Sequence, residues 1–317
     1  MYRGHRIGIA VPAYNEEKLI GETLRGIPEF VDRIYVCNDG SKDRTREIVE
    51  QRMAEDNRIS LINHEKNMGV GKSIIDCHKR ALDDGMDIVA VMAGDNQMDP
   101  VYLPSLLDPI IDGKADYSKG NRLYWRGALK GMSAWRIFGN SILTLLTKFT
   151  SGYWHISDPQ NGYTAISRKA LQRIDLDSIY PGYLFENDML TKLNAYELRT
   201  IDVPIPARYG EERSKIRYSK FIAEGLWLLM KDFVWRMKVK YVVRNFHPLV
   251  FFYLAGIPTV LVGIFGGFWS IYKKMFYGIP LFQPMAISLI VFGMGVQFLF
   301  FAMYFDMAEN RRNMNQS

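Results

Sequence analysis

Two long runs without a charged residue lie in the last quarter of the chain. Leu249–Tyr272 has 24 residues and Ile279–Phe305 has 27, and about 20 apolar residues are enough for a helix to cross the hydrocarbon core of a bilayer. Prolines and glycines interrupt both runs, which membrane helices tolerate because neighbouring groups re-satisfy the backbone. We therefore predict a hairpin of two transmembrane helices within residues 248–306. The alternative interpretation is a pair of helices buried in a soluble core.

Basic residues near the two runs predict their orientation. Six lie outside the runs and two lie between them: Arg236, Lys238, Lys240, Arg244, Arg311 and Arg312 against Lys273 and Lys274. Because basic residues collect on the cytoplasmic side, both termini, including the tail 307–317, are expected in the cytoplasm of a cell-membrane or endomembrane protein. Met1–Arg6 is polar and Ile7–Val11 is too short for the core of a signal peptide, so the N-terminal domain is also expected to stay in the cytoplasm.

The formal net charge of +6 does not come from one long basic cluster. Anionic lipid headgroups and a diphosphate are therefore better expected partners than nucleic acid. Cys37 and Cys77, the two cysteines of the chain, lack the spacing of metal ligands, and we interpret them as small buried hydrophobic residues.

The first half of the chain alternates short β-branched runs with segments of helical spacing. The pattern occurs four times, as Ile7–Val11 and Glu16–Gly26, Arg33–Cys37 and Arg44–Met53, Ile59–Ile62 and Val70–Leu82, and Ile88–Met92 and Tyr102–Ile111. Such alternation predicts an α/β domain with a mostly parallel sheet and helices on both faces. Ligands of such sheets bind beyond the carboxyl ends of the strands.

Acidic residues follow three of these four strands, in segments 12–17, 38–43 and 93–100. Taken singly, each segment has a structural interpretation. Asn15 or Ser41 would cap the next helix, and Asp39-Gly40 would form an ordinary turn.

Taken together and in this order, the segments resemble family 2 glycosyltransferases of the Rossmann-like GT-A fold. The matching motifs are Pro12-Ala13-Tyr14-Asn15-Glu16, Asp39-Gly40-Ser41-Lys42-Asp43 and an acidic loop at Asp95, and the resemblance covers about residues 6 to 220. Members that transfer a sugar to polyprenyl phosphate, including dolichyl-phosphate mannose synthases and two-span bacterial relatives, are the most similar. Asp95-x-Gln97, the stretch from Asp158 to Tyr163 and the C-terminal hairpin carry that likeness.

The resemblance implies a donor site at the strand ends. Its nucleoside pocket would be formed by Pro12, Ala13, Tyr14 and Glu16, with Asp39 binding the base or the ribose. A carboxylate suits that task because it accepts hydrogen bonds from hydroxyls or a base N–H. Asn67–Lys72 resembles the glycine-containing third loop of the family, although two glycines before a helix also fit close backbone packing.

The resemblance also implies a metal site with an altered ligand set. The family usually shows D-x-D, and Ala93 replaces the first acid of that motif. Asp95 and Gln97 remain as the implied ligands of Mg²⁺ or Mn²⁺, which take oxygen ligands from carboxylate, amide carbonyl and substrate phosphate. Such an ion would neutralise charge on the leaving diphosphate. A degenerate, inactive site is the alternative.

Basic residues are implied on the acceptor side. Arg122 would lie near the phosphates, and Arg136, at the start of the apolar helix Trp135–Phe149, would reach a lipid phosphate unless that helix belongs to the core. Arg208 and Lys215 match the family's R-x-x-G-x-S-K loop with one extra residue, and Lys215 would then serve the diphosphate. Arginine suits phosphate because its planar fork donates two parallel hydrogen bonds.

Glu186 and Asp188 occupy the place of the base in family members that use hydroxyl acceptors. An acceptor-positioning or structural role is favoured over proton transfer for both, and Asp158 is treated in the same way. A phosphate monoester is already anionic at neutral pH, so attack would depend on in-line positioning and cationic stabilisation.

These expectations combine into one function and one domain plan. Residues 1–218 would form the cytoplasmic catalytic domain and 219–247 amphipathic interfacial helices that include the Trp- and Lys-rich Phe221–Val243. The enzyme would transfer a sugar, with inversion, from a nucleotide sugar to dolichyl or undecaprenyl phosphate. One alternative is a processive polysaccharide synthase, although the sequence contains no Q-x-x-R-W motif. Another is a non-catalytic membrane scaffold. A sugar hydrolase is disfavoured because no isolated pair of carboxylates can be assigned as acid and nucleophile. Homo-oligomerisation is left open.

Overall fold

The computed structural model describes residues 1–124, 134–206 and 218–315. The chain divides into two compact units, Met1–Phe233 and the residues from Val234 onward. Each unit is described by itself.

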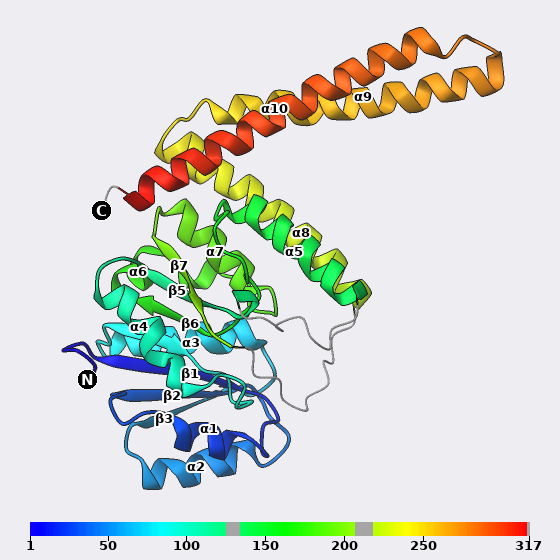
Figure 1. The fold of residues 1–317 in the computed structure, drawn as a ribbon. Helices are drawn as coiled ribbons and strands as arrows, with labels where there is room; N and C mark the ends of the chain where they lie inside the picture. The colour runs from blue at the N-terminus through cyan, green and yellow to red at the C-terminus, as the bar shows by residue number, and fades with distance from the viewer. Residues whose placement is uncertain (125–133, 207–217, 316–317) are drawn as a thin grey trace. The chain divides into compact units, whose positions relative to one another are not determined.

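The strands of the first unit form one seven-stranded sheet (Figure 1). Its order is β3-β2-β1-β4-β6-β5-β7, and the strands are β1 (Ile7–Ala13), β2 (Arg33–Asn38), β3 (Ile59–Asn63), β4 (Ile88–Val91), β5 (Tyr117–Asn121), β6 (Thr164–Ser167) and β7 (Thr200–Pro204). β6 runs antiparallel to both of its neighbours, and every other pairing is parallel. The predicted α/β fold with a mostly parallel sheet is confirmed.

Helices cover both faces of this sheet. They are α1 (Ile20–Gly26), α2 (Thr45–Glu55), α3 (Val70–Asp83), α4 (Leu103–Ile111), α6 (Arg168–Arg173) and α7 (Phe185–Ala195), and the unit also contains α5 (Ala134–Ser151) and the start of α8 (Tyr218–Lys238). One core packs α3, α6 and α7 on the sheet, and a second core packs α1, α2 and α4 on the other face. The alternation of side chains along a strand produces this division: Ile9 and Val11 of β1 belong to the second core and Ala10 to the first.

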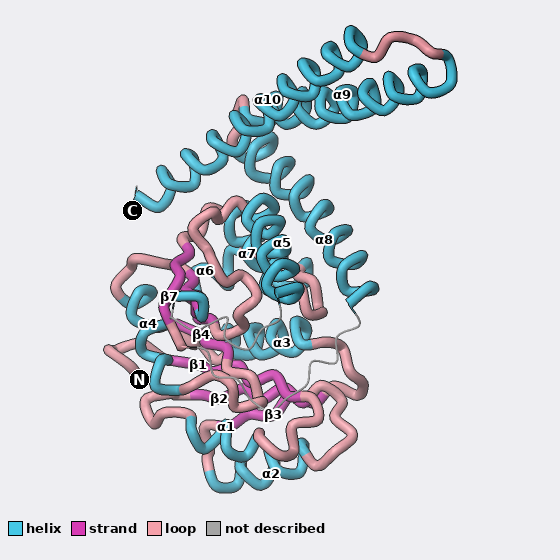
Figure 2. Tube along the Cα trace, turned by 45° about the vertical axis from the view of Figure 1, so that its right-hand side comes forward, coloured by secondary structure: helices cyan, strands magenta, loops and turns pink. Residues whose placement is uncertain are grey.

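α5 and α8 lie side by side in both views (Figures 1 and 2). The ring of Phe149 stacks on that of Phe233 with centroids 4.7 Å apart, and Thr150 donates a hydrogen bond to the carbonyl of Leu229. Each helix also exposes apolar side chains at helical spacing: Phe138, Ile142 and Leu145 on α5, and Leu226, Trp227 and Met230 on α8. Such stripes are typical of helices that lie against a lipid surface.

The second unit contains two long apolar helices. α8 passes into a π-helical turn at Val239–Arg244, and α9 (Leu249–Tyr277) and α10 (Phe282–Asn315) follow. Both are long and apolar enough to span a membrane, and most of their residues are not buried within the protein. Glycines allow the two helices to pack closely, as small residues do in membrane helix pairs. A Cβ on Gly263 would lie 2.6 Å from the backbone of Phe292.

A buried polar cluster joins the start of this unit to the end of α10. Asp306 accepts two hydrogen bonds from Arg236, at 2.9 and 3.0 Å, and one from the Tyr241 hydroxyl. Lys240 donates to the side-chain oxygen of Asn310 at 2.9 Å. Arg236 and Asp306 are both fully buried, and their opposite charges explain how two ionised groups are tolerated there.

Candidate active site

The loops after β1 and β2 are bound to each other. The backbone N–H of Asn15 donates to Ser41 Oγ at 3.0 Å, and Asn15 Oδ1 accepts from the backbone N–H of Lys42 at 2.9 Å. Glu16 N–H donates in turn to Thr45 Oγ1 at 2.8 Å. Asn15 and Ser41 therefore join two loops, and neither caps α1 or α2, whose N-caps make no side-chain hydrogen bond.

Asp39, at the end of β2, is buried and holds the third loop. Its carboxylate accepts hydrogen bonds from the backbone N–H groups of Met68 at 2.8 Å and Gly69 at 2.9 Å, and contacts His64 Nδ1 at 2.7 Å. Because Gly69 is the N-cap of α3, the carboxylate lies at the positive end of that helix, where negative charge is stabilised. Its predicted contact with the base or ribose stays a prediction.

His64 connects Asp39 to a second acid. Its Nε2 lies 3.0 Å from Asp76, which also pairs with Lys72 at 2.7 Å. Burial lowers the pKa of His64, but the hydrogen bonds and charges around it outweigh burial, so that this pKa lies above its ordinary value.

Glycines are required where the third loop meets the segment before α7. Gly69 has a φ of +100°, and a Cβ there would lie 2.5 Å from the carbonyl oxygen of Pro181. A Cβ on Gly71 would lie 2.7 Å from the carbonyl oxygen of Tyr180. The close-packing interpretation of these two glycines is confirmed.

The predicted metal loop follows β4. Asp95 is half-buried and accepts a hydrogen bond from the backbone N–H of Gln97 at 3.0 Å, across Asn96, whose φ is +56°. Gly94 N–H donates to the carbonyl of Pro12 at 3.1 Å, which places this loop beside the end of β1. Among the described residues, no three His, Cys, Asp or Glu side chains converge on a metal site. One carboxylate and one amide oxygen nevertheless fit a hard cation whose remaining ligands come from a diphosphate.

Arg122 and Asp158 form a bidentate ion pair beyond the end of β5. Arg122 Nε and Nη2 donate to the two carboxylate oxygens at 2.7 and 3.0 Å, and the backbone N–H of Arg122 donates to Oδ2 at 3.2 Å. Asp158 is buried, whereas 39% of the Arg122 side chain is exposed. Asp158 thus orients a guanidinium that reaches the surface.

A buried lysine lies behind this pair. Lys119 is fully buried and donates to the carbonyl of Asn161. Burial lowers the pKa of Lys119, against the opposing charges of Glu186 and Asp158. Burial raises the pKa of Glu186, with Lys119 acting in the opposite direction. No local pattern in the sequence marks Lys119 as a buried residue.

Asp188 has a structural role. Its carboxylate accepts from the backbone N–H of Tyr180 at 2.7 Å and lies 3.5 Å from Lys192 Nζ. It also faces Asp232 of α8; burial, followed by the charge of Asp188, raises the pKa of Asp232 to about 7. These contacts therefore support a structural role for Asp188 over proton transfer.

Sheet topology brings the described site residues to one edge. β1, β2 and β4 are parallel, and two antiparallel steps through β6 make β5 parallel to them as well. Segment 12–16 begins in the last two residues of β1 and continues beyond it, and Asp39, Asp95, Gln97 and Arg122 follow the carboxyl ends of β2, β4 and β5. Arg208 and Lys215 lie outside the described residues, as does the side chain of Arg136.

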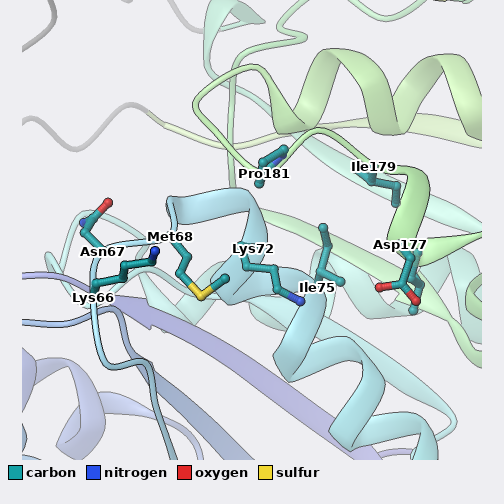
Figure 3. A pocket seen from close by; sticks show the side chains of 9 residues that line it. Lys66, Asn67, Met68, Lys72, Ile75, Asp177, Ile179 and Pro181 are labelled. Atoms are coloured by element: carbon teal, nitrogen blue, oxygen red, sulfur yellow. The ribbon is translucent and has the colours of Figure 1, made fainter.

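A cavity of about 350 Å³ opens beside the third loop (Figure 3). It is lined by Lys66, Asn67, Met68, Lys72, Ile75, Leu176, Asp177, Ile179 and Pro181. Neither Asp95 nor Gln97 lines this cavity, so the strand-end loops remain the better candidate for the active site.

Comparison with known proteins identifies the family. Residues 8–175 match the model of glycosyl transferase family 2. The chain belongs to this family. A UDP-N-acetylglucosamine–dolichyl-phosphate N-acetylglucosaminyltransferase of Methanococcus voltae is 30% identical over 65% of this chain and 86% of its own length. An undecaprenyl-phosphate mannosyltransferase of Micrococcus luteus is 28% identical over 63% and 82%, and a dolichol-phosphate mannosyltransferase of Pyrococcus furiosus is 25% identical over 81% and 70%.

Solved structures confirm the predicted GT-A fold. The UDP complex of glucosyl-3-phosphoglycerate synthase from Mycobacterium tuberculosis matches with a TM-score of 0.55 and 21% identity, over 73% of this chain and 81% of that one. Other crystals of that synthase contain UDP with Mn²⁺ or Mg²⁺. At this identity the likeness concerns the fold alone.

Proposed function

We propose that this glycosyltransferase moves a sugar, with inversion, from a nucleoside-diphosphate sugar to a polyprenyl phosphate at the cytoplasmic membrane face. The main support is the meeting of four strand-end loops at one sheet edge, with acids at β1, β2 and β4 and a guanidinium at β5. Relatives whose names specify dolichyl or undecaprenyl phosphate support the acceptor class. The apolar helices α9 and α10 would keep the enzyme beside that lipid.

The residues divide the work between donor and acceptor. Segment 12–16 and Asp39 would hold the nucleoside, and Asp95 and Gln97 would hold Mg²⁺ or Mn²⁺, which supplies charge neutralisation for the diphosphate. Arg122, oriented by Asp158, would bind phosphate oxygens. Arg136 and Arg208 are proposed to bind phosphate oxygens of the acceptor, and Lys215 is proposed to serve the diphosphate; Arg208, Lys215 and the side chain of Arg136 lie outside the described residues.

The bond changes need no general base. An oxygen of the lipid phosphate forms the new bond to the anomeric carbon, and the bond to the diphosphate oxygen breaks with its electron pair leaving on the nucleoside diphosphate. Because the acceptor is already anionic, alignment and cationic stabilisation supply the catalysis. Glu186, whose pKa burial raises, would shape the acceptor side without taking a proton.

The test is a transfer assay with the full chain in lipid nanodiscs. A panel of nucleotide sugars is incubated with polyprenyl phosphate and Mg²⁺ or Mn²⁺, and glycolipid is detected by mass spectrometry. We expect one glycosylated lipid per acceptor and loss of at least about 100-fold in kcat for Asp95→Ala, as for other electrostatic groups of active sites. Asp99→Asn is the matched control, because Asp99 lies in the same loop but only caps the 3₁₀ turn Pro100–Tyr102.

Ala93, in place of the first acid of the D-x-D motif, favours one alternative, a membrane scaffold with a degenerate site. Titration with nucleoside diphosphates in the presence and absence of Mn²⁺ separates the two. An absence of binding in both titrations, together with an absence of transfer, would contradict the proposed enzyme. Formation of a polymer in place of a single glycolipid would instead favour the processive synthase.

A further inference from the structure

Asp202 joins two segments that are far apart in the sequence. It lies on β7, the edge strand, opposite Lys119 in the register of β5. Its Oδ2 atom accepts a hydrogen bond from Asn121 Nδ2 at 2.9 Å and another from the backbone N–H of Ser157 at 2.7 Å. One carboxylate oxygen therefore connects the end of β5 to the segment that leads to β6.

Each of these two donors is the chain neighbour of one member of the ion pair. Asn121 precedes Arg122, and Ser157 precedes Asp158. The Asn121 side chain is also fixed on its other side, because its Oδ1 accepts from the backbone N–H of Leu123 at 2.9 Å. Asp202 thus fixes the separation of the backbone at Asn121 and the backbone at Ser157, and each of these residues directly precedes one member of the ion pair.

Stability alone does not explain an acid at this position. Asp202 Oδ1 is buried and hydrogen-bonds to no atom in the part of the chain that the structure describes. Burial, with the charge of Asp158 adding to it, raises the pKa of Asp202 to about 6 although Lys119 opposes the shift. An acid with one buried, unused oxygen is costly, whereas the two hydrogen bonds that Asp202 does make both lead to the Arg122–Asp158 pair.

We propose that Asp202 is a positioning residue of the transfer reaction, which sets the Arg122 guanidinium for the acceptor phosphate by fixing the backbones beside Arg122 and Asp158. This inference rests on the proposed function, because it assumes that Arg122 binds the acceptor. Asp202 would act through these two backbone segments and not by contact with either substrate. The donor loops after β1, β2 and β4 share no hydrogen bond with it, so its effect falls on the acceptor.

Three variants separate positioning from general stability. Asp202→Ala removes both hydrogen bonds. Asp202→Asn keeps one carbonyl oxygen, which is enough to accept both. Asp116→Ala is the matched control, since Asp116 joins the opposite ends of the same strand pair by accepting from Arg199 N and Nε at 2.9 and 3.1 Å.

Transfer kinetics and nucleotide binding are measured on the full chain in nanodiscs containing polyprenyl phosphate. For Asp202→Ala we expect kcat/KM for the lipid acceptor to fall about 100-fold, the loss typical of a misplacement near 1 Å. The dissociation constant for the nucleoside diphosphate should stay within about twofold, and Asp202→Asn should recover most of the activity. Asp116→Ala should keep the wild-type kcat/KM while lowering the unfolding temperature.

Equal losses in nucleotide binding and acceptor kcat/KM, or an inactive Asp202→Asn that still binds nucleotide, would overturn the inference. If Asp202→Ala does not fold, Asn121→Ser removes one of the two donors and should show the same acceptor-selective loss. A wild-type protein without any transfer to polyprenyl phosphate would instead refute the proposed function. Active wild type together with active Asp202→Ala refutes only the role of Asp202.

Discussion

Asp39→Ala should release the third loop from the N-terminus of α3. The substitution removes the acceptor for the N–H groups of Met68 and Gly69. A hydrogen bond to a charged group contributes about 1.5–3 kcal/mol net, so that two give about 3–6 kcal/mol. Met68 is 44% exposed, and water replaces part of the loss, so we expect the lower end, about 3 kcal/mol. Local opening should then become roughly 100-fold more frequent.

Amide hydrogen exchange followed by mass spectrometry measures this opening in residues 64–72 of the full chain. Asp39→Asn keeps one acceptor oxygen, and its exchange should lie between wild type and Asp39→Ala. Asp84→Asn is the control, because Asp84 accepts from Tyr35 near the other end of α3 and should leave residues 64–72 unchanged. Wild-type protection of these amides in Asp39→Ala would refute the assignment of Asp39 as the anchor of the loop.

Two further predictions concern buried charge. Arg236→Met leaves Asp306 buried without its guanidinium partner and should lower the free energy of unfolding by about 3–5 kcal/mol. The double variant Arg236→Met/Asp306→Leu should recover most of this loss. Thermal unfolding in detergent measures both, and equal stability of the single and double variants would contradict the prediction. The pKa of Asp232 is raised to about 7, so the folded state holds a proton on Asp232 that the unfolded state has lost. The stability that comes from this proton is complete below about pH 4 and is lost as the pH rises through about 7. Asp232→Asn should therefore gain stability over wild type at pH 8 and not at pH 4, by no more than about 4 kcal/mol; an equal difference at both pH values would contradict the assignment.

Local patterns predicted the first four strands within two residues, because β-branched runs and turn residues are local signals. The start of the first helix was wrong by four residues, at Ile20 and not at Glu16. The backbone N–H groups of Glu16 and Glu17 bind Thr45 and Asp43 of the next loop. These long-range hydrogen bonds, which the helical spacing cannot show, hold the residues outside the helix.

Long-range pairing explains the parts of the site that sequence reasoning missed. Arg122 was predicted near phosphate, but its bidentate bond to Asp158 joins residues 36 positions apart. Asp202 contacts Asn121 across 81 positions and belongs to no motif that marks it. The helix α7 begins at Phe185, which places Glu186 and Asp188 in its first turn, where acids are stabilised by the helix dipole.

The antiparallel strand β6 explains how one sheet edge holds both halves of the site. A parallel strand delivers residues to this edge where it ends, as β4 does for Asp95. An antiparallel strand begins at the same edge, so the residues that precede β6 arrive there. Asp158 and Gly162 are among them, and a Cβ on Gly162 would lie 3.2 Å from Glu186 and 3.3 Å from Met98 of the predicted metal loop. A search confined to strand ends therefore finds the proposed donor loops and overlooks the proposed acceptor segment, which enters the edge from the opposite direction.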